Sequence, residues 1–321
     1  MADGTCVVVD LGGTRVRVAL ADSSLALTGR REENTDHARS AAGTIDQIIR
    51  MAATSLSEAS LGWEDIAAIG IASPGPLIAS AGIVCSPPNL PGWGEVNLKA
   101  QLEARSGVPV SVVNDASGAA LGEFHAGAGK GFLHLVYLTV STGIGGGIVS
   151  DGRLLEGTLG MAGEIGHMTI DRCGPPCPCG SFGCLEILAS GTSIARRFAE
   201  QLHLGRHSVL STSPTTVMTA DIVRAARAGD EMAQEVFHAA ARDLGFGIVN
   251  VINLFNPEVV VVGGGVASAG DLLFGPVIEV VDQHAYPSTR KGVLIVPSAL
   301  GEDAGLVGAA VRAQEHRASD R

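Results

Sequence analysis

The feature that most constrains the fold is a β-strand, a glycine-rich turn and a second strand, a pattern that occurs twice. The first copy comprises Cys6–Asp10, Gly12-Gly13 and Val16–Leu20, and the second comprises Leu135–Val140, Ser141–Gly147 and Ile148-Val149. Because the copies start about 130 residues apart, we interpret them as a weak internal duplication. The repeat predicts two related α/β domains that face one another.

Between and after these copies, buried strands alternate with segments of helical periodicity. Strands are expected at 66–72, 108–113, 258–262 and 294–296, and helices at 44–61, 117–126, 185–202, 219–254 and 304–314. This alternation is typical of α/β folds with mainly parallel strand pairing.

Composition excludes several classes of protein. Hydrophobic residues make up 46% of the 321 positions, which is enough for a large core and argues against disorder. A formal net charge of −11 argues against general binding to nucleic acid or to an anionic membrane, since both require a positive surface. The N-terminal residues lack the pattern of a secretory signal, and no apolar run is long enough to span a bilayer. We therefore expect a cytoplasmic protein.

Three glycine-rich turns follow strands and are candidate phosphate or nucleotide sites. Glycines let the backbone approach phosphate oxygens closely, and the exposed N–H groups are donors. The alternative is that each is only a tight turn. Neither a Walker loop nor a dinucleotide fingerprint fits the spacing. The candidate residues are Asp10, Gly12, Gly13, Thr14 and Arg15 in the first turn, Thr142, Gly143 and Gly145 in the second, and Gly264 and Gly265 in the third.

Four of the six cysteines lie within twelve residues, which favours a metal site over disulfides in a reducing compartment. Cys177, Cys179 and Cys184 offer three thiolates on a Pro/Gly-rich loop, and His167 completes a Cys₃His set. Four protein ligands are typical of a closed, structural zinc site. Disulfide pairing and buried free thiols are the alternatives, and Cys173 is a spare candidate ligand.

Several polar residues have both a catalytic or binding interpretation and a purely structural one. Asp115 follows a strand and is either a general base or a helix-capping acid. Glu164 and Glu186 flank the cysteine cluster and suit sugar hydroxyls, although Glu186 also favours a helix start. Asn89 lies in a Pro/Gly turn and fits a turn residue equally well.

Taken together, these motifs resemble the ROK family of bacterial sugar kinases and related repressors, within the actin-like, hexokinase-type ATPase superfamily. The resemblance spans nearly the whole chain. It is carried by Asp10-Leu11-Gly12-Gly13-Thr14, Ser141–Gly147, Val259–Gly265, and His167 with Cys177-x-Cys179-Gly180-x-x-Gly183-Cys184-x-Glu186. The cysteine motif is the most specific of these.

The resemblance implies two α/β domains around a hinged cleft, with 1–113 and 302–321 forming the smaller and 114–301 the larger, which carries the zinc loop and the nucleotide site. It also implies a role for each matching residue. It makes Asp115 the catalytic base. It assigns the sugar hydroxyls to Gly75, Asn89, Asn114, Glu164, His167 and Glu186. His167 would bind zinc through one ring nitrogen and a sugar oxygen through the other. Asp10 is the expected anchor for the Mg²⁺ that accompanies ATP.

The implied reaction is ATP-dependent phosphorylation of a hexose, with the 6-hydroxyl of D-glucose as the foremost acceptor. N-acetylmannosamine, N-acetylglucosamine or another hexose is the alternative acceptor, and a non-enzymatic sugar-binding regulator is a further alternative. The first phosphate motif begins at residue 10, which leaves no room for the helix-turn-helix region of repressor members. The resemblance also suggests a homodimer or homotetramer.

Overall fold

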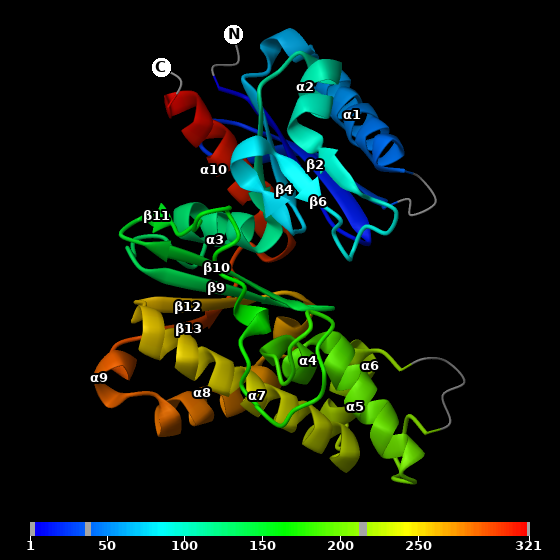
Figure 1. The fold of residues 1–321 in the computed structure, drawn as a ribbon, viewed down its shortest axis with the longest axis vertical. Coiled ribbons are helices and arrows are strands. Elements are labelled where there is room, and N and C mark those ends of the chain that lie inside the picture. Colours follow the sequence, from blue (N-terminus) through cyan, green and yellow to red (C-terminus); the bar gives the residue numbers. More distant parts are fainter. Residues whose placement is uncertain (1–3, 36–39, 212–216, 320–321) are drawn as a thin grey trace. The chain divides into compact units, whose positions relative to one another are not determined.

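The computed structural model describes residues 4–35, 40–211 and 217–319, which pack into two compact units (Figure 1). The first unit comprises 1–133, 147–163 and 298–321, and the second comprises 134–146 and 164–297. The domain boundaries expected from the sequence stay a prediction, because compact packing does not show which parts move together.

The first unit contains a five-stranded sheet with the order β3-β2-β1-β4-β8. β1 pairs antiparallel with β2 and parallel with β4, which pairs parallel with β8. The predicted hairpin at the N-terminus is therefore present. The strands are β1 (Cys6–Leu11), β2 (Arg15–Ala21), β3 (Leu27–Asn34), β4 (Ala68–Ser73) and β8 (Val110–Asn114).

Alternation along β1 assigns its side chains to two cores, because successive residues of a strand point to opposite faces. Val7 and Val9 pack in a cluster with Ile48 of α1 (Ala41–Glu58) and Leu102 of α2 (Leu98–Ser106). Val8 lies in the other cluster, with residues of α3 (Asp115–Ala126) and α10 (Ala304–Ser319). The last helix of the chain thus packs beside its first strands (Figure 1).

Helices α3 and α10 approach so closely that glycine is required where they cross. A Cβ on Gly308 would overlap the carbonyl oxygen of Gly118, and one on Gly122 would overlap that of Ala304. The same helix lies against the sheet, since a Cβ on Gly70 of β4 would overlap the carbonyl oxygen of Ala309. Because α3 begins with Asp115, this packing sets the position of that residue.

Shorter elements complete the first unit. A small sheet has the order β5-β6-β7, from Leu77–Ile78, Ile83–Cys85 and Glu95–Asn97. Single 3₁₀ turns occur at η1 (Trp63–Asp65), η2 (Ala79–Ala81) and η5 (Gly301–Asp303).

The second five-stranded sheet has the order β11-β10-β9-β12-β13, with β12 parallel to both β9 and β13. Its strands are β9 (Leu135–Val140), β10 (Ile144–Ser150), β11 (Arg153–Leu154), β12 (Val259–Gly263) and β13 (Leu294–Pro297). Strand β10 carries the chain from the second unit back to the first. Four consecutive valines in β12 are buried, as expected of a central parallel strand.

The helices of the second unit pack mainly around one long helix, α7 (Glu231–Phe255), with α8 (Asp271–His284) beside it (Figure 1). The others are α4 (Leu185–Ala189), α5 (Gly191–His203), α6 (Thr219–Arg227) and α9 (Pro287–Arg290), with 3₁₀ turns η3 (Ile165–His167) and η4 (Gly265–Ala269).

Two segments expected to be mostly helical, 185–202 and 219–254, are helical, and each is divided into two helices. Ser190 separates α4 from α5, and its hydroxyl accepts a hydrogen bond from the N–H of Ser193. Asp230 lies just before α7, and its carboxylate accepts from the N–H of Ala233. In both cases an N-cap side chain starts a new helix inside a continuous apolar pattern.

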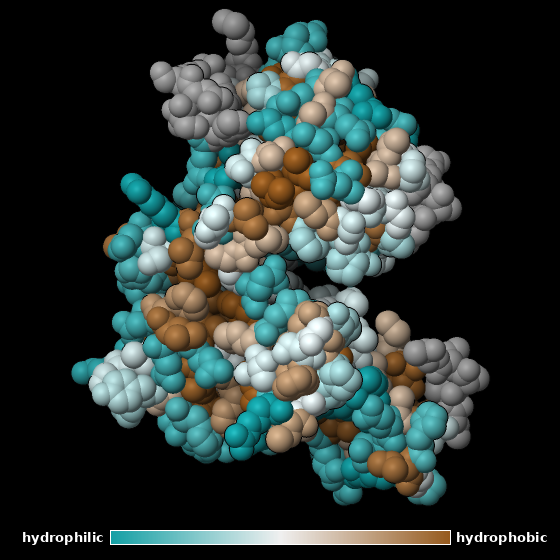
Figure 2. All heavy atoms as spheres, in the orientation of Figure 1, coloured by the Kyte–Doolittle hydropathy of each residue, from teal (hydrophilic) through white to brown (hydrophobic). Residues whose placement is uncertain are grey.

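No helix among the described residues is both long and apolar enough to cross a membrane. Hydrophilic side chains cover much of the face shown in Figure 2, with apolar patches between them.

Candidate active site

The first glycine turn is a tight connection between β1 and β2. The N–H of Gly12 donates to the carbonyl of Arg15 at 2.8 Å, and the Thr35 hydroxyl donates to the Gly12 carbonyl at 2.7 Å. A Cβ on Gly13 would lie 2.6 Å from the carbonyl oxygen of Asn89. The structure therefore brings two predicted segments together, the first phosphate turn and the exposed loop that carries Asn89.

Asp10 precedes this turn on β1. Its carboxylate pairs with Arg17, a residue that none of the predicted motifs contains. Oδ2 lies 3.0 Å from Nη1 of Arg17, which is its register partner on β2. Burial raises the pKa of the Asp10 carboxyl, and the Arg17 guanidinium opposes that rise. The hairpin register is the signal that identifies Arg17, because the residue opposite Asp10 shares its face of the sheet.

Asn114 and Asp115 lie side by side in the chain at the start of α3 and make different contacts there. Asn114 is the N-cap of α3, and its side-chain oxygen accepts from the N–H groups of Ala116 and Ser117 at 3.0 and 3.2 Å. Asp115 is the first residue of the helix, and its Oδ1 accepts from the N–H of Ala116 at 2.8 Å. Gly75 lies beside the Asn114 amide, since a Cβ there would be 3.4 Å from Nδ2.

The second glycine turn connects β9 to β10 and is folded back on itself. The N–H of Ser141 donates to the carbonyl of Gly143 at 2.9 Å, so Thr142 and Gly143 form the tip of the turn. Gly264 lies against the strand that leads into this turn, because a Cβ there would overlap the carbonyl oxygen of Val140. The second and third glycine motifs are therefore adjacent in the second unit, as expected from the parallel pairing of β9 with β12.

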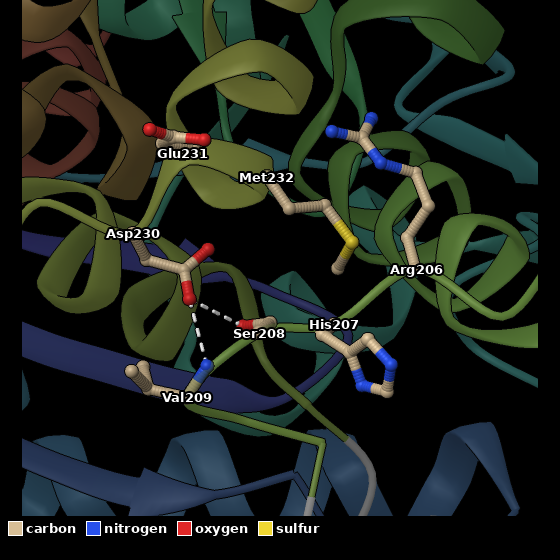
Figure 3. Close-up of a pocket in the computed structure, with 7 residues that line it drawn as sticks. All are labelled: Arg206, His207, Ser208, Val209, Asp230, Glu231 and Met232. Atoms are coloured by element: carbon tan, nitrogen blue, oxygen red, sulfur yellow. Dashed lines mark hydrogen bonds between the residues drawn. The ribbon is translucent and has the colours of Figure 1, made fainter.

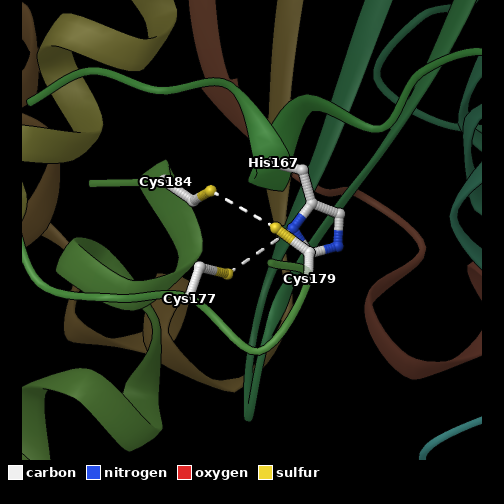
Figure 4. Close-up of side chains that lie close together, drawn as sticks. All are labelled: His167, Cys177, Cys179 and Cys184. Carbon is white, nitrogen blue, oxygen red and sulfur yellow. Dashed lines mark hydrogen bonds between the residues drawn. The ribbon is translucent and has the colours of Figure 1, made fainter. Parts of the chain in front are cut away.

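The four predicted metal ligands converge (Figure 4). The Sγ atoms of Cys177, Cys179 and Cys184 and a ring nitrogen of His167 all lie within 4.8 Å of one another. Cys179 Sγ is 3.7 Å from Cys184 Sγ, which matches the edge of a tetrahedron with Zn–S bonds of roughly 2.3 Å.

The cysteine geometry also weighs against the alternative interpretations. A disulfide would hold two sulfurs at about 2.05 Å, and all six cysteines are free. Cys179 is exposed, which is not expected of a cysteine that serves only as a buried core thiol. The donor set thus fits structural zinc. Cys173 is exposed and is not among the four converging residues.

The two glutamates that flank the cluster lie in different surroundings. Glu164 Oε2 is 4.0 Å from Nε2 of His167, and its side chain is largely exposed. Glu186 turns toward the second glycine turn, where its Oε2 accepts from the N–H of Ile144 at 2.9 Å. No sequence pattern predicts this second contact, because the two residues are 42 positions apart.

The residues assigned to sugar and phosphate are divided between the units. The first unit holds Asp10, Gly12, Gly13, Thr14, Arg15, Gly75, Asn89, Asn114 and Asp115. The second holds Thr142, Gly143, Gly145, Glu164, His167, Glu186, Gly264 and Gly265.

A surface pocket of about 450 Å³ in the second unit contains none of these residues (Figure 3). It is formed by the segment Arg206–Val209 and the start of α7. One side is the Asp230 carboxylate, whose Oδ2 accepts from the Ser208 hydroxyl at 2.8 Å and the Val209 N–H at 2.7 Å. Asp230 thus caps α7 and also holds the loop that follows α5.

The model of the ROK family matches residues 6–316 of this chain. The chain belongs to the ROK family. The glucokinase of Thermotoga maritima is 39% identical over 308 residues, which cover 94% of this chain and 95% of that protein. The N-acetylmannosamine kinase of Shigella boydii is 34% identical over 310 residues, which cover 97% and 98% of the two chains.

Among solved structures, a ROK family glucokinase from Streptomyces griseus in complex with glucose and AMPPNP matches with a TM-score of 0.84. It is 33% identical, and the match covers 97% of this chain and 100% of that one. The family resemblance and the predicted fold class, two actin-like α/β domains, are thereby confirmed.

Proposed function

We propose that this protein transfers the γ-phosphoryl group of ATP to the 6-hydroxyl of D-glucose. Its broad class is ATP-dependent sugar kinase, which is supported by the glucokinase from T. maritima and the glucose-bound and AMPPNP-bound glucokinase from S. griseus. The observation that carries the proposal is the placement of Asp115. It begins α3 at the carboxyl end of a parallel strand, where ligands bind in α/β sheets, while Asn114 provides the helix cap.

In the proposed reaction, the sugar hydroxyl oxygen attacks the γ-phosphorus and the bond to the β–γ bridging oxygen breaks. Asp115 accepts the hydroxyl proton, and ADP leaves with the electron pair of the broken bond. Because the transition state of phosphoryl transfer is loose, positioning and charge stabilisation contribute more than proton removal. N–H groups of the two glycine turns are the proposed donors to the phosphoryl oxygens.

Mg²⁺ bound with ATP supplies neutralisation of the β- and γ-phosphate charge. Asp10 is the residue proposed to hold it, directly or through water. The contact with Arg17 uses Oδ2 of the Asp10 carboxylate, so Oδ1 is the oxygen proposed to face Mg²⁺ or its bound water.

Sugar recognition is assigned to Gly75, Asn89, Asn114, Glu164, His167 and Glu186. Zinc at His167, Cys177, Cys179 and Cys184 would have a structural role, because four protein ligands leave no open position for chemistry. In this arrangement the metal holds the segment that carries His167 and orients its ring.

A second acceptor has specific support from the N-acetylmannosamine kinase of S. boydii, which is nearly as similar to this chain as the glucokinases. The two candidates differ in whether a 2-hydroxyl or a 2-acetamido group is accommodated. A sugar-binding regulator without catalysis is a weaker alternative, since the residues proposed for base and phosphate contacts are all present. A cytoplasmic homodimer or homotetramer remains the expected form of the protein.

ADP release with Mg·ATP and a panel of sugars tests the proposal. The panel contains glucose, mannose, fructose, N-acetylglucosamine and N-acetylmannosamine, and zinc-replete protein is used. Highest kcat/KM with glucose is the expected result. If only an N-acetyl sugar is phosphorylated, the proposed mechanism stands and glucose is rejected as the substrate. If no sugar of the panel is phosphorylated, phosphoryl transfer from ATP to these sugars is rejected.

A further inference from the structure

Ile144, at the end of the second glycine turn, is contacted from two directions. Its N–H donates to Oε2 of Glu186 at 2.9 Å. Its carbonyl oxygen lies so close to Gly166 that a Cβ on that glycine would overlap it. One backbone unit of the turn is therefore held between a carboxylate and a neighbouring main chain.

The two contacts come from opposite ends of the metal-binding segment, which we define as His167–Cys184. Gly166 immediately precedes His167, and Glu186 follows Cys184 by two residues. The four converging donors of this segment bring its two ends close together. The conformation of the segment therefore determines how Gly166 and Glu186 meet the glycine turn.

The turn itself is shaped to receive the carboxylate. A Cβ on Gly143 would overlap Oε2 of Glu186, so glycine is needed there for the carboxylate to reach Ile144. The turn is also held where it begins, because the N–H of Gly191 donates to the carbonyl of Ser141 at 2.7 Å. Glu186 and Gly191 lie at the starts of α4 and α5, so both contacts come from rigid elements.

We propose that Glu186 is a positioning residue for nucleotide binding, which holds the Ser141–Gly143 turn and the start of β10 in the conformation that receives the phosphates. The metal-binding segment thereby acts on the nucleotide site as well as on the sugar. This inference rests on the proposed function, which places ATP at that turn. It adds a second role to Glu186, whose Oε1 remains for the sugar hydroxyl assigned to it.

The physical basis is preorganisation. A hydrogen bond from a backbone N–H to a carboxylate is charge-assisted and stronger than one between neutral groups. Without this hydrogen bond, the glycine-rich turn has more conformations available. Nucleotide binding must then order the turn, which makes the binding free energy less favourable. Loss of Glu186 should therefore weaken nucleotide binding even when no sugar is present.

The test is the Kd of Mg·AMPPNP without sugar, measured by calorimetry on the zinc-replete protein. Glu186→Ala is expected to bind about tenfold more weakly, whereas Glu186→Gln retains an acceptor oxygen and should bind within about threefold of wild type. Glu164→Ala is the matched control. This variant removes the other carboxylate assigned to the sugar, which lies three residues before His167 in the chain. It should lower glucose affinity and leave the AMPPNP Kd unchanged.

A double-mutant cycle isolates the contact from general effects on the fold. Gly143→Ala displaces the Glu186 carboxylate by overlap and should weaken AMPPNP binding in the wild-type background. In the Glu186→Ala background the same substitution should have a much smaller effect. Equal effects in both backgrounds would overturn the proposed contact.

Amide hydrogen exchange gives a readout that does not require nucleotide. Exchange of the Ile144 N–H is expected to be faster in Glu186→Ala than in wild type and unchanged in Glu164→Ala. Unchanged exchange, or an unchanged AMPPNP Kd in Glu186→Ala, would overturn the inference whatever the sugar activity. If wild-type protein binds AMPPNP but phosphorylates no sugar, the proposed function fails while the Kd and exchange measurements still decide the role of Glu186.

Discussion

Oδ2 of Asp10 lies 3.0 Å from Nη1 of Arg17, the residue paired with it across the first hairpin. Arg17 also contacts Glu32 of β3 through Nε at 2.9 Å, so the guanidinium joins three strands at the end of the sheet. The pKa of the aspartate proposed to hold Mg²⁺ is raised by burial, and a neighbour outside the glycine motif opposes that rise.

Arg17→Met is expected to move the acid limb of the kcat/KM profile to higher pH. Burial raises the pKa of Asp10, while Arg17, and more weakly Arg30, lower it against the opposing charge of Asp303. Removing Arg17 therefore raises this pKa further, and activity is lost at a higher pH as the carboxyl gains a proton. The measurement is initial rate against pH at saturating Mg²⁺.

Arg105→Met is the control for that profile, since Arg105 pairs with Asp46 on the surface of the same unit. Its acid limb should coincide with that of wild type. An unshifted limb in Arg17→Met would show that Asp10 does not control activity at low pH.

Asp115→Asn is expected to retain glucose binding while kcat falls by about 10²- to 10⁴-fold, the usual range for removal of a general base. The amide oxygen can still accept from the N–H of Ala116, so the start of α3 should be preserved. Single-turnover phosphorylation and the glucose Kd separate the two effects. A kcat near the wild-type value would exclude Asp115 as the base.

Cys179→Ala should release the metal and raise the KM for glucose by about 10- to 100-fold, or prevent folding, because the segment carrying His167 loses its shape. Metal content by mass spectrometry and sugar kinetics are the measurements. Cys173→Ala is the matched control, because Cys173 is an exposed cysteine six residues away that is not among the four converging donors. Unchanged metal content in Cys179→Ala would refute the ligand assignment.

Gly308→Ala should lower the free energy of unfolding by about 1–3 kcal/mol or more, because its Cβ would overlap the carbonyl oxygen of Gly118 across the α3–α10 contact. Thermal unfolding should show a Tm lowered by about 2–4 °C per kcal/mol. Gly94→Ala, in the same unit, adds a Cβ to open space and should not destabilise. Equal Tm values for the two variants would show that α3 and α10 can separate without cost.

Local sequence patterns predicted the central strands and several helices, although they missed β3, the small sheet β5-β6-β7, α2 and α8. The apolar run of β1, the valine run of β12 and the helical spacing of α1 are each patterns within one element. The cysteine spacing was equally informative, because ligands on a short loop can converge only locally. Two continuous apolar patterns were divided into separate helices at Ser190 and Asp230, since capping side chains act against the periodicity.

The sequence by itself determined the chemistry of this protein, namely which residue types stand at which strand ends and which thiolates share a loop. Tertiary structure alone decided which of them meet. Arg17 reaches Asp10 through strand pairing, and Glu186 reaches Ile144 through the fold of the metal-binding segment. The first contact follows from the register of one hairpin, whereas the second joins residues 42 positions apart, for which a single sequence carries no local signal.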